Sequence, residues 1–476
     1  MPFFAIVLFL TVTTTSGLTA QTSVTLQACA EQFGENALCG WYEVPEDRSD
    51  PHGRRIQLRV VVFPARISEP AEPIVWLPGG PGQAASDLIP LGTQLLAATR
   101  ETRDLVFIGQ RGTGESNPLQ CPEDVTAQPS LAFGQLFDPG RIAECYRETL
   151  GHADPTHYST KTYVEDLAEV LSALGYDRVL FWGGSGGTRT AQVFLREYPE
   201  RVVAMALDGV TPIDYAMPLP FSRGVEDSWT RVVEDCAAQA TCADAFPDLD
   251  MDLDAIVDRF AAGPVHTSIR QQDGGSVPVV MSRGDFAYAV RGILYNANAT
   301  AFLPLRIHEA SETDDLSFFA QSLFNRMVVL RGNIIAMGLH LASYCAEDVP
   351  RLENDTVRQQ TAGTLLGDYL VREYRGACNV WPVSPMPADW YRPARSDVPT
   401  LILSGYYDPS TPATAAERVA AYLPNNLHII VRNSGHGSGF TCARETVERF
   451  LVNGSLDGLV DPCPQTPIVF EVGASR

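Results

Sequence analysis

Helical and strand-like segments alternate along the middle of the chain, and this alternation constrains the fold more than any other feature. A helix is expected from Thr162 to Leu174, because apolar residues recur there at helical spacing after a Thr-x-x-Glu capping box. The segments that follow are strand-like at 178–182, helical at 188–198 and strand-like again at 202–207. This alternation predicts right-handed strand-helix-strand units and a mostly parallel sheet flanked by helices.

Further strands are expected on both sides of this region. Residues 54–65 alternate in polarity, as a half-buried antiparallel strand at a sheet edge would. Two short apolar runs, at 73–77 and 104–108, end in glycine-rich turns and are interpreted as buried strands whose loops reach one rim of the sheet. Strand and helix resume late in the chain, at 399–403, 414–423, 427–431 and 442–452.

The stretch between these two regions has a different pattern. Residues 213–394 show helical runs and loops with no clean strand alternation. We interpret them as a mainly helical cap subdomain inserted into the core. The core then comprises residues 21–212 and 395–476, which are separate in sequence and rejoined in space. A total of 476 residues is long enough for one large core with such an insertion.

Charge and composition exclude several classes of protein. The formal net charge is −22, and hydrophobic residues make up 45% of the sequence. The negative charge repels nucleic acids and anionic lipid surfaces, so no nucleic-acid partner is expected. No Rossmann fingerprint, P-loop or zinc-binding array occurs, so neither a cofactor nor a metal is expected. The acidic run 248–254 lacks the glycine and glutamate of a calcium loop, and we interpret it as a solvated helix start.

The first twenty residues predict export. They contain no charged side chain and hold an apolar run from Pro2 to Val12, followed by small residues that end at Ala20. We interpret residues 1–20 as a signal peptide, which makes the mature protein secreted or periplasmic with no stable membrane association. An uncleaved membrane anchor is the alternative, but roughly eleven apolar residues fall short of the ~20 that span a bilayer.

An even number of cysteines agrees with an oxidising compartment. Disulfides are a better explanation for them than buried free thiols, and pairing each cysteine with its next neighbour would close five short to medium loops. Sequence alone leaves the connectivity open. The ten cysteines are Cys29, Cys39, Cys121, Cys145, Cys236, Cys242, Cys345, Cys378, Cys442 and Cys463.

A Gly-x-Ser-x-Gly motif at residues 183–187 lies between a predicted strand and a predicted helix. A serine hydroxyl is a poor nucleophile, so an enzyme must present it on a tight strand-to-helix turn within reach of a base. Flanking glycines permit the crowded backbone of such a turn. Ser185 is therefore the candidate nucleophile, and a structural turn serine is the alternative interpretation.

A base and an acid are expected later in the chain, in the order serine, acid, histidine. His436 follows a late strand, where its loop would lie over the rim, whereas the competing His428 falls inside a strand. Asp408 follows the preceding strand and would orient the histidine. An aspartate before proline can also be an ordinary turn residue.

Acyl transfer also needs hydrogen-bond donors for the oxyanion. The backbone amide of Gly186 is one candidate, because it follows the nucleophile directly. The second candidate is Gly80, with Gly79 close behind, in the loop Pro78-Gly79-Gly80-Pro81-Gly82. A plain tight turn is the alternative for this loop.

These and further motifs together resemble secreted α/β-hydrolases of the tripeptidyl aminopeptidase and prolyl aminopeptidase family. The resemblance runs through nearly the whole mature chain and implies the α/β-hydrolase fold. The motifs that carry it are Gly79-Gly80-Pro81-Gly82, Gln110-Arg111-Gly112-Thr113-Gly114, Gly184-Ser185-x-Gly187-Thr188-Arg189, Leu207-Asp208-Gly209-Val210, Cys345-Ala346-Glu347-Asp348, Trp381-Pro382, Asp408-Pro409-x-Thr411-Pro412 and Gly435-His436-Gly437.

The resemblance implies an aminopeptidase that releases amino-terminal residues or short peptides through an acyl-enzyme. Such an enzyme must bind an ammonium group, and Glu347 and Asp348 match the cap motif of the family. Solvated acidic residues are the alternative for both. Two positions depart from the family, Gly186 where an aromatic residue is usual and Gly109 where aspartate is usual. These departures keep a carboxylesterase or amidase open, beside a catalytically silent binding protein.

Overall fold

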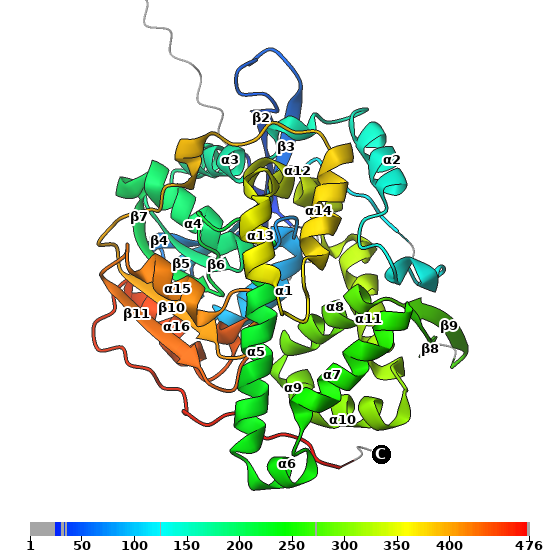
Figure 1. The fold of residues 1–476 in the computed structure, drawn as a ribbon. Helices are drawn as coiled ribbons and strands as arrows, with labels where there is room; N and C mark the ends of the chain where they lie inside the picture. The colour runs from blue at the N-terminus through cyan, green and yellow to red at the C-terminus, as the bar shows by residue number, and fades with distance from the viewer. Residues whose placement is uncertain (1–23, 30–32, 34–35, 124, 272–273, 474–476) are drawn as a thin grey trace, which may run out of the picture.

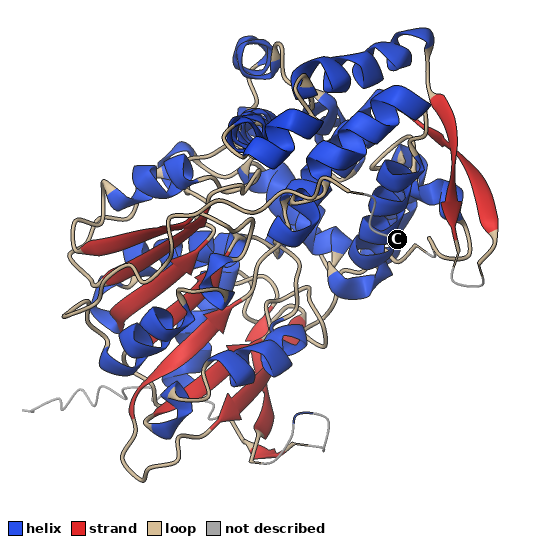
Figure 2. Ribbon diagram, turned by 90° about the horizontal axis from the view of Figure 1, so that it is seen from below, coloured by secondary structure: helices blue, strands red, loops and turns tan. Residues whose placement is uncertain are grey.

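A computed structural model describes residues 24–29, 33, 36–123, 125–271 and 274–473. The predicted signal peptide, residues 1–20, lies outside these ranges. The described chain forms a core built on one large sheet and a helical region beside it (Figures 1 and 2). Among the described residues, no helix is long and apolar enough to cross a bilayer.

The large sheet has nine strands within the described residues, in the order β1-β2-β3-β5-β4-β6-β7-β10-β11. The first four of these are joined by antiparallel pairing, and the strands from β5 to β11 in this order pair in parallel. The strands are β1 (Gln27–Ala28), β2 (Leu38–Pro45), β3 (Arg55–Phe63), β4 (Ala71–Leu77), β5 (Arg103–Ile108), β6 (Val179–Gly184), β7 (Val202–Asp208), β10 (Thr400–Gly405) and β11 (Asn426–Val431). The predicted fold class is therefore confirmed.

Helices cover both faces of this sheet. Apolar side chains of α3, α4 and α15 pack on one face, and those of α1 and α16 pack on the other. These helices are α1 (Ile89–Leu95), α3 (Thr160–Ala173), α4 (Gly186–Glu197), α15 (Ala413–Ala420) and α16 (Arg444–Asn453). Strands buried on both faces in this way read as continuous apolar runs, which explains the sequence pattern of 73–77 and 104–108.

The region between β7 and β10 is built around a hydrophobic core in which helices from both of its ends take part, and apolar residues of the segment 125–145, with Ile468 and Phe470, pack into the same core. Its helices are α5 (Pro220–Ala237), α6 (Ala240–Ala245), α7 (Leu249–Arg259), α8 (Arg283–Leu294), α9 (Ala297–Thr300), α10 (Leu303–Thr313), α11 (Ser317–Val329), α12 (Met337–Glu347), α13 (Asn354–Thr361) and α14 (Tyr369–Val380). We refer to residues 213–394 as the cap. β7 and β10 lie side by side although the whole cap separates them in sequence (Figure 1).

Three local predictions were wrong. The cap contains a two-stranded antiparallel sheet, β8 (Val265–Arg270) with β9 (Ser276–Met281), where no strand was expected. Nine of the twelve residues of these two strands are exposed or half-exposed, so little of their sequence is apolar in a strand-like pattern. The strand β3 lies between β2 and β5 rather than at the edge, because an unpredicted strand, β2, covers it.

The third error concerns the start of α3. The capping side chain is Ser159, whose hydroxyl accepts a hydrogen bond from the Thr162 amide, so the helix begins at Thr160 and the Thr162–Glu165 capping box does not form. The acidic run 248–254 does enter a helix, α7, with Asp250 and Asp252 in its first turn.

Five disulfides join each cysteine to its next neighbour in the chain. The pairs are Cys29–Cys39, Cys121–Cys145, Cys236–Cys242, Cys345–Cys378 and Cys442–Cys463. The described residues include no free cysteine. Each bond therefore ties together a local segment and leaves the arrangement of core and cap to packing.

Candidate active site

Ser185 occupies the sharp turn between β6 and α4. Its backbone has φ 51° and ψ −119°, a conformation that costs energy for a residue with a side chain and that is typical of functional turns. The Ser185 amide donates to the carbonyl of Asp208 on the neighbouring strand (2.8 Å), which holds the turn in place. A Cβ at Gly187 would lie 2.2 Å from the Leu77 carbonyl oxygen, so this motif position has no room for a side chain.

His436 and Asp408 form a direct hydrogen bond. Nδ1 of His436 lies 2.7 Å from Oδ2 of Asp408, and because the carboxylate accepts, Nδ1 carries a proton and Nε2 is the nitrogen that acts as a base when the ring is neutral. Asp408 is fully buried. It also accepts hydrogen bonds from the amides of Ser410 (2.8 Å) and Thr411 (3.0 Å) and from the Thr411 hydroxyl (2.6 Å).

The electrostatics of this pair favour a charged histidine. Burial disfavours both charged forms, but Asp408 raises the pKa of His436 above its ordinary value. In the same way burial would raise the pKa of Asp408, but His436 and Thr411 hold it below its ordinary value. Such a pair stabilises the imidazolium that forms when the histidine takes a proton.

Two neighbours hold the His436 loop against the core. The His436 amide donates to the carbonyl of Tyr295 in the cap (2.9 Å), and the two rings lie 4.5 Å apart. Asp208 at the end of β7 accepts from the amides of Ser438 (2.9 Å) and Gly439 (3.0 Å). The loop is therefore fixed from the cap on one side and from the sheet on the other.

Gly405, at the end of β10, lies against this loop without room for a side chain. A Cβ there would lie 1.7 Å from the Gly435 carbonyl oxygen. We expect Gly405→Ala to lower the free energy of unfolding by about 3 kcal/mol or more and to reduce activity, because the loop cannot close on the strand. Thermal unfolding measures this, with Gly376→Ala as control, since a Cβ there meets nothing within 4 Å. Equal melting temperatures for both variants would contradict the expectation.

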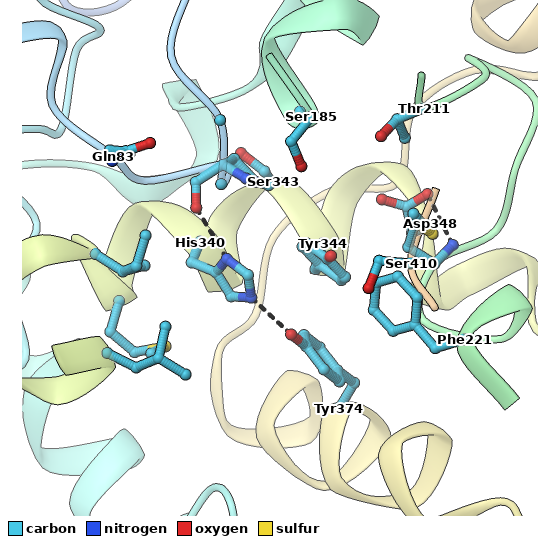
Figure 3. A pocket seen from close by; sticks show the side chains of 18 of the residues that line it. Gln83, Ser185, Thr211, Phe221, His340, Ser343, Tyr344, Asp348, Tyr374 and Ser410 are labelled. Carbon is cyan, nitrogen blue, oxygen red and sulfur yellow. Dashed lines mark hydrogen bonds between the residues drawn. The ribbon is translucent and has the colours of Figure 1, made fainter. Parts of the chain in front are cut away.

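Ser185 and His436 line one cavity of about 320 Å³ between core and cap. The Ser185 side chain points into it, with Tyr344 and Tyr374 of the cap on the other side (Figure 3). Among the described residues, no hydrogen bond within 3.5 Å joins Ser185 to His436. Catalytic hydrogen bonds are often long before substrate binds and shorten in the complex. The lack of a hydrogen bond here is therefore compatible with Ser185 as nucleophile and His436 as its base.

The two oxyanion candidates lie together beside the serine. A Cβ at Gly186 would lie 3.1 Å from the carbonyl carbon and oxygen of Gly80, and Gly80, Gly79 and Gly186 all line the cavity. A Cβ at Gly79 would lie 3.2 Å from Cβ of Ser185. The absence of a side chain at 186 therefore keeps the helix start close to this loop.

A cap histidine that the sequence analysis left without a role holds the oxyanion loop. Nδ1 of His340 donates to the Pro81 carbonyl (2.9 Å), and Nε2 accepts from the Tyr374 hydroxyl (2.7 Å; Figure 3). Burial lowers the pKa of His340 to about 4, although the Pro81 carbonyl opposes this, so the ring is neutral at pH 7. No sequence signal identifies this contact, since α12 and the loop are about 260 residues apart.

Glu347 and Asp348 both line the cavity, and neither is a solvated surface acid. Asp348 pairs with both terminal nitrogens of Arg189 on α4 (2.9 and 3.1 Å). Glu347 accepts from the Thr160 amide (2.6 Å) and hydroxyl (3.0 Å) at the start of α3, and it lies 3.6 Å from Arg189. These bonds fasten the end of α12 to two core helices, a role that the sequence analysis missed. Arg189 was visible only as a member of the nucleophile motif.

His428, the alternative base, lies away from the cavity. It projects from β11, and its Nε2 lies 2.9 Å from the Ser404 hydroxyl on β10. It is not part of the cavity lining.

A Cβ at Gly109, the second departure from the family pattern, would lie 2.2 Å from the Ser116 hydroxyl oxygen. A larger residue at 109 therefore requires a shift of Ser116.

Within the described residues, no group of three or more His, Cys, Asp or Glu side chains is placed to hold a metal ion. The chemistry that the cavity offers comes from a hydroxyl, an imidazole, a carboxylate and backbone amides.

Comparisons with known proteins identify relatives of this chain. Residues 72–244 match the family model described as alpha/beta hydrolase fold, and residues 364–463 match the model described as TAP-like protein. Serine protease Hip1 of Mycobacterium tuberculosis is 26% identical over 468 residues, 88% of this chain and 86% of that protein. Carboxylesterase B of the same organism is 25% identical over 467 residues, 90% and 85% of the two chains. Tripeptidyl aminopeptidase of Streptomyces coelicolor is 28% identical over 188 residues, 36% and 35% of the two chains.

Proposed function

This chain is an α/β-hydrolase of the tripeptidyl aminopeptidase-like family and a serine hydrolase, and from that premise we propose that it is an exported aminopeptidase. The observation that carries the proposal is the small cavity, because it holds the candidate nucleophile and base together with a cap carboxylate. At about 320 Å³ it is at the lower end of ligand pockets, which suits an amino-terminal residue or a short acyl group.

In this mechanism Ser185 attacks the scissile carbonyl while His436 takes the hydroxyl proton at Nε2. The amides of Gly186 and Gly80 donate to the oxyanion. His436 then gives its proton to the leaving amine, which leaves an acyl-enzyme. Water, activated by the same histidine, attacks the ester and releases the acyl product. Asp408 keeps the imidazole in its working tautomer through both steps.

Glu347 is the proposed partner of the substrate ammonium group. Arg189, Asp348 and Glu347 together carry one negative charge when both acids are ionised, and a cation would balance it. Burial raises the pKa of Glu347 to about 7, although Arg189 opposes this. A carboxyl with that pKa is an anion above pH 7 and neutral below it.

The discrimination between free and blocked amino termini should therefore depend on pH. We expect kcat/KM for alanine p-nitroanilide, divided by kcat/KM for its N-acetyl derivative, to fall as pH decreases through about 7 and Glu347 takes up a proton. Glu347→Gln should lower this ratio about tenfold at about pH 7.5 and remove its decrease on the acid side, whereas a decrease above about pH 8 follows the α-amino group of the substrate and should stay. Loss of a purely structural contact would change the melting temperature but leave the ratio unaltered, and equal cleavage of free and blocked substrates by the wild type would refute the aminopeptidase.

A carboxylesterase is the second candidate, because a relative that matches most of the chain is named carboxylesterase B. An esterase would hydrolyse short acyl 4-nitrophenyl esters and leave both anilides intact.

Export is supported by the five disulfides, which form in oxidising compartments. Peptide mass spectrometry of the mature protein would test it, with an amino terminus at Gln21 as the expected result.

A further inference from the structure

Two arginines of the cap line the cavity without a carboxylate partner. Arg291 lies on α8 and Arg326 on α11. Among the described residues, no Asp or Glu oxygen lies within 4.0 Å of either guanidinium group. The other two arginines of the lining are balanced, Arg189 by Asp348 and Arg331 by a buried bond to Glu123. The net charge of the chain is −22, so this pair of arginines without a carboxylate partner contrasts with the acidic character of the protein as a whole.

Arg291 is held rigidly although it lacks an anion. Only 4% of its surface is exposed, and its Nε is buried with no hydrogen-bond partner. One terminal nitrogen donates to the Ser410 hydroxyl (2.6 Å), and the guanidinium carbon lies 4.2 Å from the centre of the Phe221 ring. Arg326 is half-exposed; its Nε is buried without a partner, and its guanidinium group hydrogen-bonds to Tyr288 and Tyr295. Burying a cation without an anion is costly, so such residues in a cavity indicate an anionic ligand.

The positive charge of the two arginines lowers the pKa of the Tyr295 hydroxyl. Both guanidinium groups lie over the Tyr295 ring, Arg326 at 4.8 Å and Arg291 at 5.0 Å from its centre. Burial would raise the pKa of this hydroxyl, but His436 and the two arginines lower it to about 7. Ionised Tyr295 would balance at most one of the two cations, so a positive charge remains in either state.

We propose that Arg291 and Arg326 form a subsite for a carboxylate carried by the substrate, close to the scissile bond. The subsite adjoins the triad, because Arg291 contacts Ser410 in the loop of Asp408 and both arginines flank Tyr295, whose ring lies on His436. A guanidinium pair binds a carboxylate through charge-assisted hydrogen bonds. This inference deepens the proposed function and rests on hydrolysis by Ser185, but it does not require a free amino terminus.

The carboxylate has two possible sources. It can belong to an acidic side chain on the acyl part of the substrate, or to the end of a short leaving peptide. Glutamic acid p-nitroanilide against glutamine p-nitroanilide tests the acyl side, because the two differ by charge and hardly in size. The dipeptide Ala-Ala against its carboxamide tests the leaving side. Glutarate against glutaramide, as inhibitors of 4-nitrophenyl butyrate hydrolysis, tests the subsite without any peptide.

We expect the wild type to favour the anionic member of at least one substrate pair by about 10- to 100-fold in kcat/KM, and glutarate to inhibit more strongly than glutaramide. Arg291→Met and Arg326→Met should each reduce the preference about tenfold or more, and Arg291→Lys should restore part of it. Arg283→Met removes the same charge from the exposed start of α8, outside the cavity lining, and should keep the preference.

Hydrolysis of neutral 4-nitrophenyl butyrate and labelling with a fluorophosphonate test the catalytic role of Ser185 separately from the carboxylate subsite. Hydrolysis and labelling that depend on Ser185, without any preference for an anion, would overturn the carboxylate subsite and leave the serine hydrolase intact. The same conclusion follows if the preference survives both arginine variants. No labelling of Ser185 would instead overturn the mechanism. The wild-type ratios decide the matter even if an arginine variant does not fold.

Discussion

Ser185→Ala is expected to lower the turnover of esters and peptide anilides by about 10⁴- to 10⁶-fold. The variant loses the atom that bonds to the substrate carbonyl, and neither His436 nor the oxyanion amides can replace it. Its fold should persist, because Ser185 Oγ makes no hydrogen bond to another described residue. Steady-state hydrolysis of 4-nitrophenyl butyrate and labelling with a fluorophosphonate measure the effect.

Ser228→Ala is the matched control, since Ser228 is a buried serine of α5 whose hydroxyl also has no hydrogen-bond partner. It should keep both hydrolysis and labelling. A Ser185→Ala protein that still hydrolyses and is still labelled would show that another residue is the nucleophile, and a silent binding protein would leave the wild type unlabelled too.

The second large effect is expected for Asp408→Asn, about 10⁴-fold in kcat. An amide at this position favours the wrong tautomer of His436 and no longer stabilises the imidazolium. The wild-type pKa of His436 is raised by Asp408, so activity on a neutral ester should increase with pH on the alkaline side of the ordinary histidine value. In the variant this titration should move to lower pH, because the charge that favoured the protonated ring is gone.

His428→Gln serves as the control, because His428 is the other late histidine and lies on β11 away from the cavity. Its activity and pH profile should match those of the wild type. An Asp408→Asn enzyme with normal kcat would exclude Asp408 as the orienting acid, provided that circular dichroism shows a native fold.

The parts of the fold that the sequence predicted well are those with strong local patterns. The runs that became β4, β5, β6 and β7 are continuously apolar because both faces of each strand are covered, and they stand out between glycine-rich turns. The alternation of strand and helix then limits the topology to a parallel sheet. The strands β8 and β9 gave no such signal, since most of their residues are exposed or half-exposed.

The candidate site divides in the same way. Ser185, Asp408 and His436 could be named because each lies in a loop after a recognisable strand. Arg291 and Arg326 could not, since a helix that packs inside a cap looks the same in sequence whether one of its faces lines a cavity or not. The long-range contact of His340 with the oxyanion loop depends on how the cap docks, and no local pattern describes that.

The two strands that bracket the cap, β7 and β10, are direct neighbours, with Met205 opposite Thr400 and Asp208 opposite Leu403. The whole cap is thus an insertion between two neighbouring strands of the sheet. The length of the insertion does not affect the register of these strands. Changes in the cap can reshape what the enzyme accepts without a shift in the register of the sheet, provided that the contacts of Tyr295 with His436 and of His340 with Pro81 are kept. Substrate range can therefore change while the sheet stays the same, and exchanging residues 213–394 between relatives that keep these two contacts is a direct route to new specificities.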